Sequence, residues 1–158
     1  MVLLLLVYDI LYNVVILMND VIKVVAALTR YQDKYLIAKR IKGDEGAAGK
    51  WEYPGGKIEK EESLFDAIKR EMKEEFYLDV EPIKEITKNT TEYPTRTIEV
   101  TLILCTSNTD KVKMNIRDHS DYRWVTIDEL NTYDFAISDS KTKPSFAYFS
   151  YSASNSLY

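Results

Sequence analysis

Apolar residues recur at helical spacing in the middle of the chain, between Trp51 and Leu78. The spacing predicts one amphipathic helix that begins at Leu64. Ser63 is a candidate N-cap, and Asp66 three residues later completes a capping-box pattern. The apolar stripe of this helix consists of Leu64, Phe65, Ile68, Met72 and Phe76.

The half of the chain before this helix has the pattern of strands. β-branched residues over Val21–Leu28 predict a buried strand, and Tyr35–Arg40 predicts a second strand after a turn at 31–34. The segment Ile41–Gly49 contains three glycines and is predicted to be a mobile loop. A Gly-Gly turn is expected at positions 55–56.

The half after the helix also predicts strands. A weakly patterned strand region over 80–93 is expected to pair with Thr97–Thr106, which alternates between apolar and polar residues. A polar loop over 110–118 leads to a short strand over Tyr122–Thr126. A capping-box pattern over 126–129 predicts a brief helix after it. The apolar side of the alternating strand consists of Ile98, Val100, Leu102 and Leu104.

The first eighteen residues are nearly all apolar. The run is shorter than the roughly 20 residues that a membrane-spanning helix needs, and Asp9 and Asn13 interrupt it. We interpret residues 1–18 as an N-terminal extension, with a mis-called start codon before Met18 as one origin. A membrane anchor and an added core element remain alternatives. The chain from Met18 onward should fold without the extension.

The folded domain is expected over residues 19–137, and residues 138–158 form a serine-rich tail. The tail has no helical periodicity, and its serines and Pro144 oppose a helix. A flexible tail, an added strand and an altered sequence end all fit this composition. We expect poor order after about Ser140, which trypsin would reveal by cleavage at Lys141 and Lys143.

Composition excludes several classes of site. With 158 residues the chain is long enough for one domain with a substantial core, and its net charge of −4 argues against non-specific nucleic-acid binding. Its single cysteine, Cys105, rules out an internal disulfide, and its single histidine, His119, rules out a histidine-rich metal site. His119 is expected to be a loop residue rather than a catalytic group.

Three carboxylates cluster on the predicted helix. Glu71, Glu74 and Glu75 stand at positions i, i+3 and i+4, so they share one sector beside the apolar stripe. Carboxylate oxygens are the ligands that hard divalent cations prefer. A solvated acidic face is the alternative interpretation of such a cluster.

The surroundings of this cluster resemble the Nudix box. Five residues separate Gly56 from Glu62, seven more separate Glu62 from Arg70, and the sequence Glu-Met-Lys-Glu-Glu follows. The preceding Trp-Glu-Tyr-Pro-Gly-Gly-Lys is similar to the entry of the MutT-like branch, the nucleoside triphosphate pyrophosphohydrolases. The box departs once, because Tyr77 stands where the family usually has glycine, and a left-handed backbone there costs another residue about 1 kcal/mol.

The resemblance implies an α+β fold, with a Nudix-like mixed, curved β-sheet sandwiched between α-helices. It implies an enzyme that hydrolyses a nucleoside triphosphate to the monophosphate and pyrophosphate by water attack at phosphorus. The substrate could be an oxidised purine nucleotide or a CTP-like pyrimidine. A hydrolase of another nucleoside diphosphate derivative, such as a nucleotide sugar, and a non-catalytic nucleotide sensor on the same fold are the alternatives.

The resemblance also implies a metal site and a catalytic set. The metal would be Mg²⁺, with Mn²⁺ as a substitute. Either Glu74 or Asp118 would take the proton of the attacking water, and Arg70 would hold the glutamates by charge-assisted hydrogen bonds. Asp118 is a turn residue under the alternative interpretation. The implied catalytic residues are Arg70, Glu71, Glu74 and Asp118, and the implied metal site consists of Gly56, Glu71, Glu74, Glu75 and Asp118.

On the substrate side, Arg40 and Lys57 are implied to bind phosphate oxygens, and Gly55 and Gly56 to let the backbone turn tightly. Asp139 lies roughly where some relatives place a residue that reads the nucleobase. We expect a cytoplasmic monomer or homodimer whose partner is its nucleotide substrate, with no stable nucleic-acid partner and no membrane.

Overall fold

The computed structural model describes residues 5, 7, 20–43 and 46–141. The predicted extension over 1–18 therefore lies outside the described residues, apart from Leu5 and Val7, and so does the tail beyond Lys141. The expectations for a dispensable N-terminal segment and a poorly ordered C-terminal tail stay predictions.

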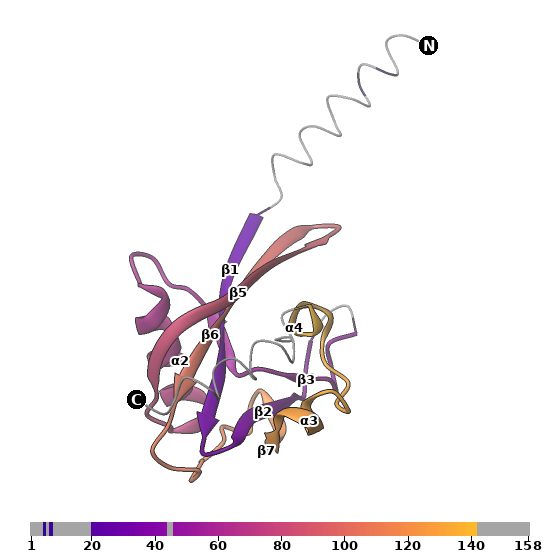
Figure 1. Ribbon diagram of the computed structural model, residues 1–158. Helices are drawn as coiled ribbons and strands as arrows, with labels where there is room; N and C mark the ends of the chain where they lie inside the picture. Colours follow the sequence, from indigo (N-terminus) through magenta and orange to yellow (C-terminus); the bar gives the residue numbers. More distant parts are fainter. Residues whose placement is uncertain (1–4, 6, 8–19, 44–45, 142–158) are drawn as a thin grey trace.

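One mixed β-sheet organises the described part of the chain (Figure 1). Its strand order is β3-β2-β1-β6-β5, with β4 paired to β1 and β7 paired to β2. β1 and β6 pair in parallel over their whole length, and the other pairs are antiparallel. The strands are β1 (Asp20–Tyr31), β2 (Lys34–Arg40), β3 (Trp51–Glu52), β4 (Gly55–Lys57), β5 (Glu81–Tyr93), β6 (Arg96–Thr106) and β7 (His119–Thr126).

Helices cover both sides of this sheet (Figure 1). The long helix α2 (Leu64–Phe76) lies on one side, and the short helices α3 (Ile127–Leu130) and α4 (Ile137–Ser140) lie on the other. Alternate residues of β1 accordingly enter two core clusters, Val25 on the α2 side and Ala26 on the other. The predicted α+β sandwich is confirmed.

The predicted helix and its cap are confirmed in α2. Ser63 has an extended backbone, and its Oγ accepts a hydrogen bond from the Asp66 amide at 3.1 Å. The second half of the expected capping box differs, because the Asp66 carboxylate accepts from Ser63 Oγ at 2.6 Å. The full capping box predicted at Thr126 is present at the start of α3.

The structure buries more of β6 than alternation alone predicts. The predicted apolar side, including Val100 and Leu102, packs on the side of α3 and α4. The opposite side is buried too, because Thr101, Ile103 and Cys105 lie against the α2 layer. A strand with helices on both sides needs apolar residues on both faces.

Two local predictions are wrong. Gly55 and Gly56 form strand β4 rather than a turn, and Gly56 pairs with Val25 of β1. The start of the predicted tail is helical, because Ile137–Ser140 form α4. Tertiary packing sets both segments, since neither has a local sequence period. Within the described ranges, no helix is both long and apolar enough to cross a membrane.

Candidate active site

A cavity of about 730 Å³ lies where β1, β2, β4, α2 and α4 meet. This volume is typical of sites for small molecules. Arg70 and Glu74 are not part of the described wall, and 60% of the Glu74 side chain is exposed. The predicted site residues that line the cavity are Arg40, Gly55, Gly56, Lys57, Glu71, Glu75, Asp118 and Asp139.

Arg70 fastens the loop before α2 to the helix itself. Its guanidinium donates to both carboxylate oxygens of Glu62, at 2.7 and 2.9 Å, and to Glu71 Oε1 at 2.7 Å. A further bond of 3.0 Å reaches the Lys57 carbonyl. The hydrogen bonds from Arg70 lower the pKa of Glu62 to about 2. Arg70 therefore fixes the direction of the Glu71 carboxylate at the cavity wall.

Glu75 is the most perturbed carboxyl group at the cavity. Burial, followed by the charges of Glu52, Glu71 and Asp118, raises its pKa to about 9. Its buried Oε2 has no hydrogen-bond partner among the described residues. The ammonium of Lys73, on the same helix, pairs with Asp79 at 2.8 Å. The positive charge of Arg40 acts in the opposite direction and lowers the pKa of Glu75.

The donor chemistry of this wall fits a hard divalent cation. Glu71, Glu75 and Asp118 supply carboxylate oxygens to one cavity, and the orphaned Oε2 of Glu75 has capacity for a cationic partner. Within the described ranges, no three acidic, histidine or cysteine side chains are grouped closely enough to hold an ion as they stand. Binding would therefore require side-chain rearrangement, since Glu71 is engaged by Arg70.

A buried network in the wall of the cavity, formed by Arg40, Glu52 and His119, was missed by the sequence analysis. Glu52 Oε2 accepts from Arg40 at 2.5 Å, and Glu52 Oε1 lies 2.7 Å from His119 Nε2. His119 is the first residue of β7 and only 2% exposed, so its assignment to a loop is wrong. The centroid of its ring lies 5.2 Å from the ring centroid of Phe76 in α2. The available signal was an acidic residue flanked by Trp51 and Tyr53, because a charge among buried aromatics needs a partner.

Close approach explains both glycines of β4. A Cβ atom on Gly55 would lie 2.0 Å from the carbonyl oxygen of Val25, and one on Gly56 would lie 2.4 Å from the Glu71 carboxylate. Gly55 therefore lets β4 approach β1, and Gly56 makes room for a site carboxylate.

The loop that carries Asp118 is attached to the end of α2. The Asn115 amide donates to the Glu75 carbonyl at 2.6 Å, and the Lys113 amide donates to the Phe76 carbonyl at 3.1 Å. These bonds satisfy carbonyls that the helix end leaves free. Asp118 thereby reaches the same cavity as Glu75.

Tyr77 ends α2 in the left-handed conformation that its position requires, with φ 51° and ψ 30°. Its amide donates to the Lys73 carbonyl at 3.1 Å, and the amide of Leu78 donates to the Met72 carbonyl at 3.3 Å. The ring lies 5.1 Å from the ammonium of Lys113. Tyr77 therefore ends the helix in the conformation that glycine usually provides at this position of the family. It also adds a contact to the loop that carries Asp118.

Replacing Tyr77 with glycine should give a protein more stable than the alanine variant by about 1 kcal/mol. Both variants lose the ring, so the difference isolates the backbone cost of the left-handed conformation. Urea unfolding of the two variants measures it. Equal free energies of unfolding would contradict the prediction.

Asp139 approaches the cavity from α4, inside the segment predicted to be a tail. Its Oδ1 accepts from the Tyr53 amide at 3.1 Å, and its Oδ2 accepts from Ser138 Oγ at 3.1 Å. Burial and the charge of Glu52 raise the pKa of Asp139. The domain boundary predicted at 137 therefore cuts through a segment that lines the cavity.

Comparisons with known proteins give a family and a fold. The NUDIX domain family matches residues 21–146. The CTP pyrophosphohydrolase of Escherichia coli (strain K12) is 44% identical over 54 residues, a stretch that spans 34% of this chain and only 39% of that relative.

Two solved structures share the fold across most of the chain. The E. coli ORF135 protein has a TM-score of 0.69 at 24% identity, with 89% of this chain and 96% of that chain covered. A MutT protein from Methanosarcina mazei Go1 has a TM-score of 0.70 at 24% identity, with 85% and 96% covered. At these identities the two structures support the fold alone.

Proposed function

Because this chain belongs to the Nudix family, we propose that it is a pyrophosphohydrolase that hydrolyses a nucleoside triphosphate to the monophosphate and pyrophosphate. Water adds to one of the two phosphorus atoms of the α,β-anhydride, and the bond from that phosphorus to the bridging oxygen breaks, so one water is consumed for each nucleotide cleaved. We further propose Mg²⁺ as the metal, with Mn²⁺ as a substitute.

The observation that carries this proposal is the partly buried Glu75 side chain, whose buried Oε2 has no partner among the described residues and which stands at the wall of a cavity together with Glu71 and Asp118. Carboxylates alone would repel a triphosphate. A divalent cation, when bound by Glu71, Glu75 and Asp118, would offset the phosphate charge and make the attacking water more acidic. Glu74 would join the ion only if its exposed side chain turned inward.

The remaining roles fall to groups of the chain that already face the cavity. Arg40 and Lys57 place positive charge at the wall, where they can bind phosphate oxygens. Asp118 is better placed than Glu74 to accept the proton of the water, because Asp118 lines the cavity. Arg70 keeps Glu71 in place by its bond of 2.7 Å.

The partial likeness to a CTP pyrophosphohydrolase supports CTP as the first substrate to test. The full chain should release pyrophosphate from at least one nucleotide of a panel that contains CTP, UTP, dCTP, dGTP, oxidised dGTP and a nucleotide sugar. Chromatography identifies the products with Mg²⁺, with Mn²⁺ and without metal. The peak of any nucleotide that is cleaved should convert to monophosphate only when a metal is present.

Other outcomes of this panel separate the alternatives. Cleavage of the nucleotide sugar but of no triphosphate would indicate that the substrate is a nucleoside diphosphate derivative. Binding without turnover would indicate a nucleotide sensor. Release of orthophosphate in place of pyrophosphate would refute the proposed bond cleavage.

A further inference from the structure

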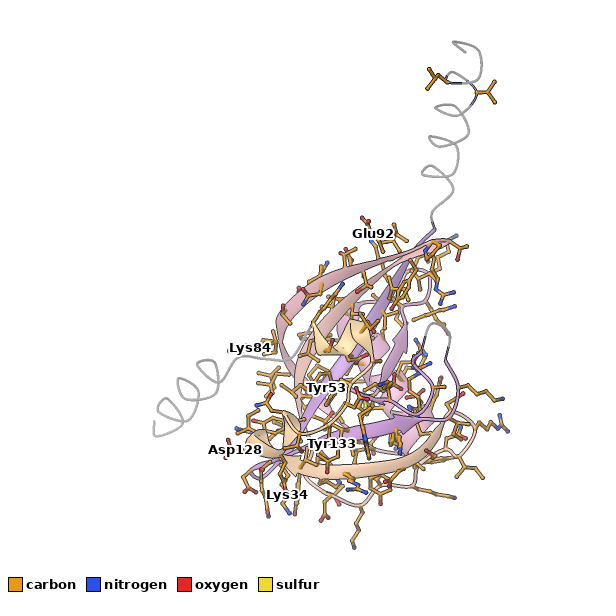
Figure 2. The ribbon with its side chains drawn as sticks, turned by 90° about the vertical axis from the view of Figure 1, so that its right-hand side faces the viewer. Lys34, Tyr53, Lys84, Glu92, Asp128 and Tyr133 are labelled. Atoms are coloured by element: carbon orange, nitrogen blue, oxygen red, sulfur yellow. The ribbon has the colours of Figure 1, made fainter. Side chains whose placement is uncertain are left out.

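The hydroxyl group of Tyr53 is a buried polar group that the proposed chemistry does not use. Tyr53 is 2% exposed, and its Oη has no hydrogen-bond partner in the part of the chain that the structure describes. Figure 2 shows Tyr53 in the interior of the molecule, in contrast to Glu92 and Lys34 at its ends. The residue lines the cavity, whereas its hydroxyl oxygen is closed to solvent in this conformation.

Such a hydroxyl should lower the stability of the ligand-free protein, as its desolvation is uncompensated. Removing a phenol from water without giving it a hydrogen bond is unfavourable, whereas phenylalanine would fill the same space against Phe135, whose ring centroid is 5.0 Å away. Thr29 offers a useful contrast, because its Oγ1 also lacks a partner among the described residues but Thr29 does not line the cavity. A ligand bound in the cavity is therefore the candidate hydrogen-bond partner of the Tyr53 hydroxyl.

The two sides of the cavity differ in character. Glu71 and Glu75 come from α2, whereas Tyr53 belongs to the apolar cluster on the side of α3 and α4. Apolar residues near Tyr53 on the cavity wall include Val24, Ile98, Val100 and Ala136. A charged side suits phosphates, and an apolar side with a few polar groups suits the base and sugar.

We infer that the Tyr53 hydroxyl, opened to the cavity by a shift of its ring or of the facing wall when nucleotide binds, hydrogen-bonds the nucleoside portion and helps to select it, an inference that rests on the proposed function. Burial and the nearby charge of Asp139 raise the pKa of the phenol, so it stays neutral and can donate a hydrogen bond. Its partner would be an oxygen or nitrogen acceptor on the base or the sugar. A site built around such a bond discriminates against nucleotides that lack the acceptor.

The Tyr53→Phe variant tests this inference, because it removes one oxygen atom and keeps the ring. For the preferred nucleotide, kcat/KM should fall at least about tenfold, while the least preferred nucleotide should lose less than about threefold. The melting temperature of the metal-free variant should equal or exceed that of the wild type. This combination separates loss of a substrate contact from damage to the fold.

The matched control is Thr29→Val, which removes the other buried hydroxyl that lacks a partner among the described residues. It should leave the ratio of kcat/KM between the two nucleotides unchanged. An unchanged ratio in Tyr53→Phe, or an equal loss for both nucleotides, would overturn the inference while leaving the proposed hydrolysis intact.

If the wild type hydrolyses no nucleotide, the proposed function fails and the inference is decided by binding. Isothermal titration with CMP, UMP, AMP and GMP should then show the tightest ligand bound at least about tenfold more weakly by Tyr53→Phe. Equal dissociation constants, or no binding to either protein, would overturn it.

Discussion

Replacing Glu75 with glutamine should lower metal-dependent turnover by at least about 10²-fold, the range associated with losing one essential charged group. Glutamine keeps the shape of the side chain but cannot carry the negative charge that a divalent cation requires. Mg²⁺ should consequently raise the melting temperature of the variant much less than that of the wild type, because the ion stabilises by binding the folded site. Steady-state kinetics and thermal unfolding with and without Mg²⁺ measure both effects.

The same substitution should stabilise the metal-free protein at alkaline pH. The folded pKa of Glu75 is about 9, against an ordinary value of 4.5, so the folded state binds this proton more tightly than the unfolded state. Stability is therefore fullest below pH 4.5 and falls as the pH rises through about 9. Glu75→Gln removes this dependence of stability on pH. The stability of the variant relative to the wild type should therefore increase between pH 4.5 and about 9.

Lys73→Gln is the matched control, since Lys73 is on the same helix and its ammonium pairs with Asp79. It should keep both turnover and the response to Mg²⁺. Near-normal metal-dependent hydrolysis by Glu75→Gln would show that the glutamates are only an acidic surface.

Adding one methyl group to each glycine of β4 should produce two different defects. Gly55→Ala places a Cβ atom 2.0 Å from the Val25 carbonyl oxygen and 2.9 Å from the Ala26 Cα atom. These are backbone atoms of the central strand β1, which cannot move without disturbing its parallel pairing with β6. We expect a loss of about 3 kcal/mol in the free energy of unfolding.

For Gly56→Ala, the three heavy atoms nearest to the added Cβ atom all belong to the Glu71 carboxylate, at 2.4 to 2.6 Å. This side chain can turn away, at the cost of its hydrogen bond to Arg70, or about 1 kcal/mol. Activity should fall at least about tenfold, because a residue at the proposed metal site has been displaced. Urea unfolding and turnover assays compare the two variants. Similar losses of stability in both would contradict the separation of fold and site.

Local sequence patterns determined the elements of this protein. The apolar stripe of α2, the N-cap at Ser63 and the capping box at Thr126 all depend on residues within one or two helical turns, so spacing along the chain was sufficient to predict them. The alternation of Thr97–Thr106 identified β6 for the same reason. The fixed spacing from Gly56 to Glu75 also indicated the family.

Tertiary structure decided which of these residues form a site. Glu52 and His119 are 67 positions apart and meet only because β2 carries β3 on one edge and β7 on the other. Burial, which separates the perturbed Glu75 from the exposed Glu74, depends on what packs against α2 rather than on the order of residues within it. Asp139 enters the cavity because its carboxylate binds the Tyr53 amide across 86 positions, and no local period of the sequence encodes such a contact.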